Sequence, residues 1–213
     1  MGIDEAMNGD GTPVALRPLR PEDIPAAVRI HTEGMPYSLN VRLGGKHLAY
    51  VYEKTMAHKA SIAVGAFCGG ELAGVVSATR DPQALAGHLM SGLGARRLCA
   101  LCARLLARPW LVLDYFEARR LGRPVVSNGE AVEACLTAIV VAPDYRGRRV
   151  AQALVHAVDA FMRDNGIKTY RLDTRVSNER SQAFYRKEGF VEAERRGRNI
   201  IFVRSVNSNG RTV

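Results

Sequence analysis

Apolar and polar positions along the chain switch between the two-residue period of strands and the longer period of helices. Ser61–Cys68 and Glu71–Thr79 are apolar runs rich in β-branched residues, and the Gly69-Gly70 pair between them predicts a β-hairpin. The longest strand-like run extends from Ala131 to Val141 and stops before Pro143. These runs predict the centre of a sheet.

Helical spacing follows directly after that long run. Val150, Leu154, Val158 and Phe161 recur at helical intervals until Asn165-Gly166, which predicts a helix that ends there. The other expected elements are a strand at 14–20, helices at 21–33 and 39–59, a strand at 167–175, a helix at 179–188 and a strand pair at 190–206. This order predicts an α/β fold: a single domain over 13–206 with one mixed sheet and helices on its faces. Residues 1–12 are expected to be a flexible leader and 207–213 a tail.

Residues 81–130 separate the third expected strand from the fourth, and such a length is too great for a structureless loop. Apolar and basic positions form two adjacent helical stripes there, namely Leu98, Leu101, Cys102, Leu105 and Leu106 beside Arg97, Arg104 and Arg108. A second apolar segment runs from Trp110 to Leu121. We therefore expect two short amphipathic helices. They could form a lid packed on the domain, a dimer contact, or a basic surface that meets a lipid-linked substrate at a membrane.

Composition narrows the class of protein. The 213 residues carry a net charge of +9, which favours anionic partners. Aromatic residues make up only 7%, and no block interleaves aromatic with basic residues, so nucleic acid is a poor candidate. The start has no secretory order and no apolar run reaches membrane-spanning length, which predicts a cytoplasmic protein. Four scattered cysteines are expected to be reduced, packed thiols rather than disulfides or metal ligands: Cys68, Cys99, Cys102 and Cys135.

A candidate binding site is indicated where the long strand meets the helix that follows it. A turn rich in Arg and Gly joins them, so backbone N–H groups and the positive end of the helix dipole converge on one point. Such a point binds a pyrophosphate, and arginines beside it add favourable charge. The turn and the first residues of the helix are Arg146, Gly147, Arg148, Arg149, Val150 and Ala151.

This turn resembles the signature Arg/Gln-x-x-Gly-x-Gly/Ala of the GNAT acetyltransferase superfamily, with Arg149 in place of the middle glycine. A second block, from Asn178 to Phe190, is similar to the family segment that ends in Tyr-x-Lys-x-Gly-Phe. The resemblance implies acetyl-CoA, or another acyl-CoA, as co-substrate and no metal. It further implies binding of coenzyme A by the backbone of Ile139, Val140 and Val141, by the turn at 146–151, and by Asn178, Ser181 and Tyr185.

The resemblance also implies roles in catalysis. Tyr185 matches the tyrosine that protonates the leaving thiolate, and the N–H of Val141 would stabilise the oxyanion. Glu133 is the candidate base, on the fourth strand and on one face with Thr137 and Ile139. Glu130, Asp173 or a water relay are the alternatives.

The expected reaction is N-acetyl transfer to a primary amine of a small molecule of the amino-sugar or natural-product type. Three alternatives remain open: longer acyl chains, a lipid-linked acceptor, and a non-catalytic module that binds acyl-CoA or nucleic acid. The chain could act as a monomer or a homodimer.

Overall fold

The computed structural model describes residues 5–7, 13–127 and 129–206. Most of the expected leader and all of the expected tail at 207–213 lie outside these residues. Within the leader, Glu5–Met7 forms strand β1, which pairs antiparallel with β2 (Pro13–Pro18). That part of the leader therefore extends the sheet.

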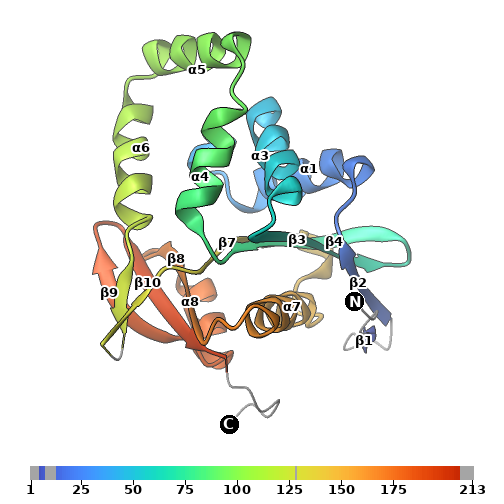
Figure 1. Ribbon diagram of the computed structural model, residues 1–213. Helices are drawn as coiled ribbons and strands as arrows, with labels where there is room; N and C mark the ends of the chain where they lie inside the picture. The colour runs from blue at the N-terminus through green and yellow to red at the C-terminus, as the bar shows by residue number, and fades with distance from the viewer. Residues whose placement is uncertain (1–4, 8–12, 128, 207–213) are drawn as a thin grey trace.

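A single sheet of eight strands runs through the molecule in the order β1-β2-β3-β4-β7-β8-β10-β9 (Figure 1). Only β7 and β8 are parallel neighbours, and every other neighbouring pair is antiparallel. Its remaining strands are β3 (Ser61–Cys68), β4 (Glu71–Thr79), β7 (Cys135–Val141), β8 (Thr169–Arg175), β9 (Val191–Arg196) and β10 (Asn199–Ser205). The mixed sheet confirms the predicted fold class.

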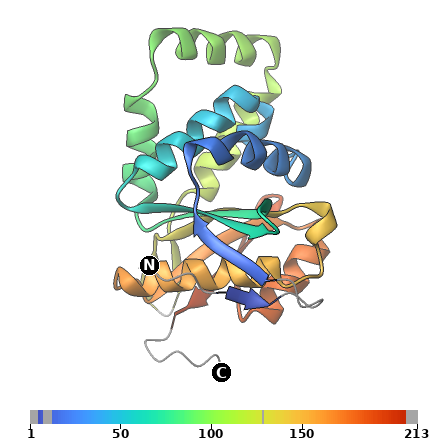
Figure 2. The same ribbon diagram turned by 90° about the vertical axis from the view of Figure 1, so that its right-hand side faces the viewer.

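Helices cover both faces of the sheet. The short 3-10 turn η1 (Pro21–Asp23) leads into α1 (Ile24–Gly34), which packs with α3 (Gly45–Ala57) on one face, and α7 (Val150–Asp164) and α8 (Glu179–Lys187) lie on the other (Figures 1 and 2). The α7 side buries Leu154 and Val158 with Leu172 of β8. The α1 side buries Ile30 with Val140 of β7. Each core follows the apolar stripe of its helices, because a helix must bury that stripe against the sheet.

The helix expected over 39–59 is interrupted. It consists of α2 (Leu39–Arg42) and α3, with Gly44 between them at φ 97°. That backbone conformation suits glycine and ends a right-handed helix, because it lies in the left-handed region. The prediction of one continuous helix is therefore wrong at this turn.

The expected insert contains three helices rather than two. They are α4 (Pro82–Ser91), α5 (Ala95–Ala107) and α6 (Trp110–Leu121), followed by a small separate hairpin of β5 (Val125–Ser127) and β6 (Glu130–Val132). The run from Ala131 to Val141 is accordingly two strands, with Glu133 and Ala134 between them. The segment forms three helices because it is interrupted twice, at Gly92–Gly94 and at Pro109.

Arginines of the sheet hold the end of α6. The Arg171 guanidinium donates to the carbonyls of Leu121 and Gly122, both at 3.0 Å, and Arg196 donates to those of Arg123 and Pro124, both at 2.8 Å. The last carbonyls of a helix have no partner within it, so these donors satisfy them. The lower end of the insert is thus fixed against β8 and β9.

Candidate active site

β7 and β8 separate after one point of contact. Their single register pair is Cys135 with Arg171, and the Arg171 N–H donates to the Ala134 carbonyl at 2.9 Å. Beyond this pair, the described parts of the two strands share no further register partner. A gap therefore opens toward the C-terminal ends of both strands.

Backbone donors of β7 point into this gap. The Ala142 N–H donates to the Ala73 carbonyl at 2.9 Å, on the β4 side. Because N–H groups alternate in direction along an extended strand, those of Val141 and Ile139 face away from β4, toward β8. The two backbone groups expected to contact an acyl-CoA are thus turned toward the gap.

A β-bulge shifts the strand before this point. Ser77 of β4 faces Ala138 while Ala78 faces Leu136, so Thr137 is the extra residue on β7. Thr137 is held there, since its hydroxyl donates to the Ser77 carbonyl at 3.0 Å. Relative to an uninterrupted strand, the side chains before the bulge therefore point to the opposite face of the sheet.

The bulge overturns the expected geometry of Glu133. The prediction that Glu133 lies on this strand, on one face with Thr137 and Ile139, is wrong, because β7 begins at Cys135 and the bulge inverts the alternation. Glu133 also precedes the point where β7 and β8 touch, at the closed end of the gap. The alternative Glu130 lies on β6 in the separate hairpin.

Asp173 is the carboxylate on the open side of the gap. It lies two positions after Arg171 on β8. Leu172 joins the core cluster that includes Tyr185, so Asp173 next to it points to the opposite face of the sheet. Asn199 Nδ2 donates to Asp173 Oδ2 at 2.6 Å. Asp173 keeps solvent contact, yet the surrounding protein desolvates its carboxyl and raises its pKa, and the Asn199 hydrogen bond partly offsets that effect.

Tyr185 of α8 lies beneath the gap. Its ring packs against Phe190 at 5.5 Å and Phe202 at 6.0 Å between centroids. Burial raises the pKa of its hydroxyl, and the nearby charge of Asp173 adds to the effect. Tyr185 therefore stays protonated at neutral pH. Asp173 and Tyr185 lie on opposite faces of the separated strands.

The turn before α7 presents open backbone at the mouth of the gap. It follows the 3-10 turn η2 (Pro143–Tyr145), and residues 146–149 are all exposed. Gly147 has φ 81° and Arg149 has φ 59°, and Arg149 is the one described non-glycine residue with positive φ. Arg149 thus adopts the left-handed conformation that a glycine takes readily. The departure from the family pattern leaves a glycine-like backbone at this position.

The other predicted ligands include one residue with a structural role. The Asn178 side chain accepts from the Ser181 N–H at 3.2 Å and caps α8. Arg146 Nε donates to the Val141 carbonyl at 3.3 Å, which ties the turn to the end of β7.

The prediction of packed thiols is correct for the buried Cys68 and Cys135 and wrong for Cys99 and Cys102, which α5 exposes.

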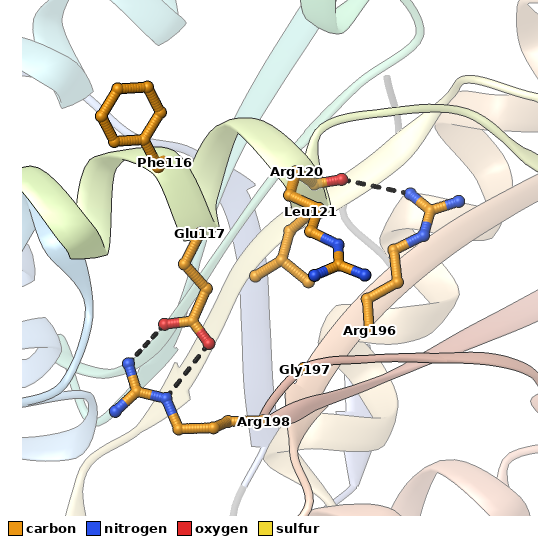
Figure 3. A pocket seen from close by; sticks show the side chains of 7 residues that line it. All are labelled: Phe116, Glu117, Arg120, Leu121, Arg196, Gly197 and Arg198. Carbon is orange, nitrogen blue, oxygen red and sulfur yellow. Dashed lines mark hydrogen bonds and ion pairs between the residues drawn. The ribbon is translucent and has the colours of Figure 1, made fainter.

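One hollow of about 360 Å³ lies where α6 crosses the β9–β10 turn (Figure 3). Its lining consists of Phe116, Glu117, Arg120, Leu121, Arg196, Gly197 and Arg198. Glu117 accepts two hydrogen bonds from Arg198, at 2.5 and 3.2 Å, and its charge contributes to the raised pKa of Asp173. Sequence reasoning missed Asn199 and Glu117, because they approach Asp173 only through tertiary structure.

The described residues include no group of three or more side chains arranged to hold a metal ion. Within the same residues, the helices are too short or too polar to cross a bilayer. The candidate site brings together backbone donors, the Asp173 carboxylate, Tyr185 and the basic turn.

Comparison with known proteins identifies the family of this chain. The sequence matches the Acetyltransferase (GNAT) family over residues 32–190. An uncharacterized N-acetyltransferase of Mycobacterium tuberculosis is 31% identical over 126 residues, which cover 56% of this chain and 81% of the relative.

Solved structures share the fold. The PaiA N-acetyltransferase of Thermoplasma acidophilum, solved in complex with coenzyme A, superposes with a TM-score of 0.59 at 15% identity, over 90% of this chain and 98% of that one. The ribosomal-protein-S18-alanine N-acetyltransferase of Escherichia coli gives 0.56 at 19% identity, over 94% and 98%. With the family match spanning most of the domain, the chain belongs to the GNAT family and is an N-acetyltransferase.

Proposed function

We propose that the protein transfers an acetyl group from acetyl-CoA to a primary amine of a small-molecule acceptor. The observation that carries this proposal is the gap between β7 and β8, with the N-terminus of α7 at its mouth and Asp173 and Tyr185 on opposite faces. A direct transfer needs such an arrangement, since the amine and the leaving thiolate occupy different sides of the reacting carbonyl.

In this mechanism the backbone of residues 147–151 binds the pyrophosphate of acetyl-CoA. The first N–H groups of α7 have no partner within the helix, and the dipole favours negative charge there. The left-handed turn at Gly147 and Arg149 supports this role, because it keeps the backbone exposed. The N–H groups of Ile139 and Val141 bind the pantetheine arm and the thioester oxygen. Loss of an oxyanion donor costs on the order of a hundredfold or more in rate.

Asp173 serves as the general base in place of Glu133. It takes a proton from the acceptor ammonium, and the free amine attacks the thioester carbon. As the carbon–sulfur bond breaks, the Tyr185 hydroxyl gives its proton to the departing thiolate. The attacking nitrogen loses its second proton, which returns through water to Tyr185, and Asp173 releases its own proton to solvent, so that amide and free coenzyme A leave a restored site. The raised pKa of the Asp173 carboxyl suits a base that must accept a proton near neutral pH.

The acceptor would enter from the α6 side, where Glu117 and its partner Arg198 line the hollow and the Glu117 charge acts on Asp173. Tyr37 stands on the same side, with the Arg175 guanidinium 5.2 Å from its ring centroid. An amino sugar or natural-product amine is the acceptor class we favour. A lipid-linked amine is the alternative.

The test is a calorimetric titration with acetyl-CoA and longer acyl-CoAs. We compare the wild type with Gly147→Glu and with Gly166→Glu as matched control. Both glycines have positive φ, at 81° and 71°, and an added Cβ meets nothing within 4 Å at either, but Gly166 follows the opposite end of α7. Loss of binding in Gly147→Glu alone supports the cradle, and the preferred chain length identifies the donor. Absence of binding to any acyl-CoA by the wild type would refute the proposal.

A further inference from the structure

The helix α5 and the start of α6 expose a set of large apolar side chains. We call it the apolar stripe, formed by Leu98, Cys102, Leu106, Trp110 and Leu113. Leu106 is 85% exposed, Leu113 69%, Trp110 55% and Leu98 49%, and no residue of α5 is buried. Both views place α5 at the end of the molecule farthest from α7 and α8 (Figures 1 and 2). Soluble proteins rarely leave such a set uncovered unless it contacts a partner.

The helix α5 turns a mixed side to the domain, where Leu101 and Leu105 are half-buried beside two arginines. The Arg97 guanidinium lies 4.3 Å from the ring centroid of Tyr50 on α3, and the Arg104 guanidinium packs at Gly44. Two arginines therefore face the domain, while Leu98 and Leu106 face away. A surface helix normally turns its apolar side to the core. The stripe is therefore exposed even though α5 also has a polar side that could have faced the solvent.

Charge indicates which partner fits. Between Asp81 and Asp114 the chain has no Asp or Glu, whereas it has four arginines: Arg96, Arg97, Arg104 and Arg108. Arg96 and Arg108 are exposed near the two ends of α5. A second copy docked on this surface would bring arginines together with no carboxylate from the same segment to neutralise them. An anionic, apolar surface matches both the charge and the stripe.

We propose that α5 and the first turn of α6 dock on a bilayer that contains anionic lipid. The apolar stripe enters the boundary between headgroups and acyl chains, and Arg96 and Arg108 contact lipid phosphates. A basic helix with a strong apolar face and low overall hydrophobicity binds in this way without spanning the membrane. The docking is separate from acetyl transfer and requires no particular acceptor.

Trp110 makes the test direct, because it is the single tryptophan of the chain. Its emission is recorded while the full-length protein is titrated with vesicles of mixed phosphatidylglycerol and phosphatidylcholine, or of phosphatidylcholine alone. We expect a blue shift and co-sedimentation with the mixed vesicles only, weakened by salt. Leu106→Glu should reduce the affinity about tenfold or more, because an apolar contact is replaced by a charge that lipid repels. Arg96→Gln and Arg108→Gln should each reduce it about fivefold.

Val191→Glu on β9 is the matched control, since Val191 is 66% exposed and distant in sequence from the stripe. It should bind vesicles like the wild type. Acetyl-CoA titration of every variant separates a docking defect from a folding defect. Absence of binding to mixed vesicles, or equal binding by Leu106→Glu and the wild type, would overturn the proposal. A Trp110 shift that depends on protein concentration without vesicles would instead assign the stripe to a second copy.

Discussion

The side-chain amide of Asn199 donates to Asp173 at 2.6 Å, and so connects β10 to the carboxylate beside the gap between β7 and β8. This bond lowers the pKa of Asp173, whereas desolvation by the surrounding protein raises it more strongly. Asn199 therefore keeps the pH at which the proposed base becomes available lower than it would be without this hydrogen bond.

Replacement of Asn199 by Ala should move the acid limb of the kcat/KM profile to higher pH, because the carboxylate loses a donor that favours its charged form. The measurement is the pH profile of acetyl transfer once an acceptor is identified. Asn165→Ala is the control, since its side-chain amide donates to the Phe161 carbonyl at the end of α7. An unshifted limb in Asn199→Ala would exclude Asp173 as the titrating base.

Asp173→Asn should lower the activity and should also change how the stability of the fold depends on pH. General-base catalysis typically contributes about a hundredfold or more, so kcat/KM should fall by at least that factor. Because the pKa of Asp173 is raised in the folded state, the folded protein binds the proton more tightly than the unfolded chain does. Its stability therefore declines as pH rises from the ordinary value of 3.8 through the raised one.

Thermal unfolding across that pH range should show the difference. The wild type should lose Tm as pH rises through the Asp173 titration, whereas Asp173→Asn should lose less. A variant that keeps full activity would transfer the role of base to a water relay or another carboxylate.

Tyr185→Phe should leave the fold intact and slow the reaction. Phenylalanine keeps the ring contacts with Phe190 and Phe202, so the free energy of unfolding should change by less than about 1 kcal/mol. Without the hydroxyl, the thiolate leaves unprotonated, and kcat should fall about a hundredfold. Steady-state kinetics and chemical denaturation measure the two effects. A large loss of stability with unchanged kcat would assign Tyr185 a structural role alone.

The sequence predicted best those features that are specified by residues close together in the chain. The hairpin at 61–79 and the turn at 146–151 are local, since Gly69-Gly70 and the Arg-Gly run specify their own backbone. Tyr185 follows from a motif of consecutive residues. Such features depend on neighbours in the chain, and a pattern along the sequence can therefore reveal them.

The base could not be predicted in the same way. Glu133 has the spacing of a strand residue, but the bulge at Thr137 and the break after β6 depend on pairing with β4 and β8. Asp173, one of the alternatives that the sequence left open, is favoured over Glu133 only once β8 separates from β7 and Asn199 arrives from β10. The exposed side of α5 also depends on tertiary contacts, because Arg97 is drawn to Tyr50.

Arg149 gives the last prediction, because its backbone adopts φ 59° with a long side chain. The left-handed conformation costs a non-glycine residue about 1–2 kcal/mol, and the greater freedom of glycine in the unfolded chain offsets about 0.5–1 kcal/mol. Arg149→Gly should therefore raise the free energy of unfolding by about 0.5–1 kcal/mol, which corresponds to a Tm increase of about 2 °C.

Arg149→Ala is the matched control, because it removes the same charge and keeps the strain. It should show no rise in Tm. Since both variants lose the guanidinium, a difference in their affinity for acetyl-CoA reports the backbone alone, and the glycine variant should bind more tightly. Equal Tm and equal affinity in the two variants would mean that the left-handed turn contributes neither strain to the fold nor donors to the cradle, and pyrophosphate binding would then depend on the arginine side chains.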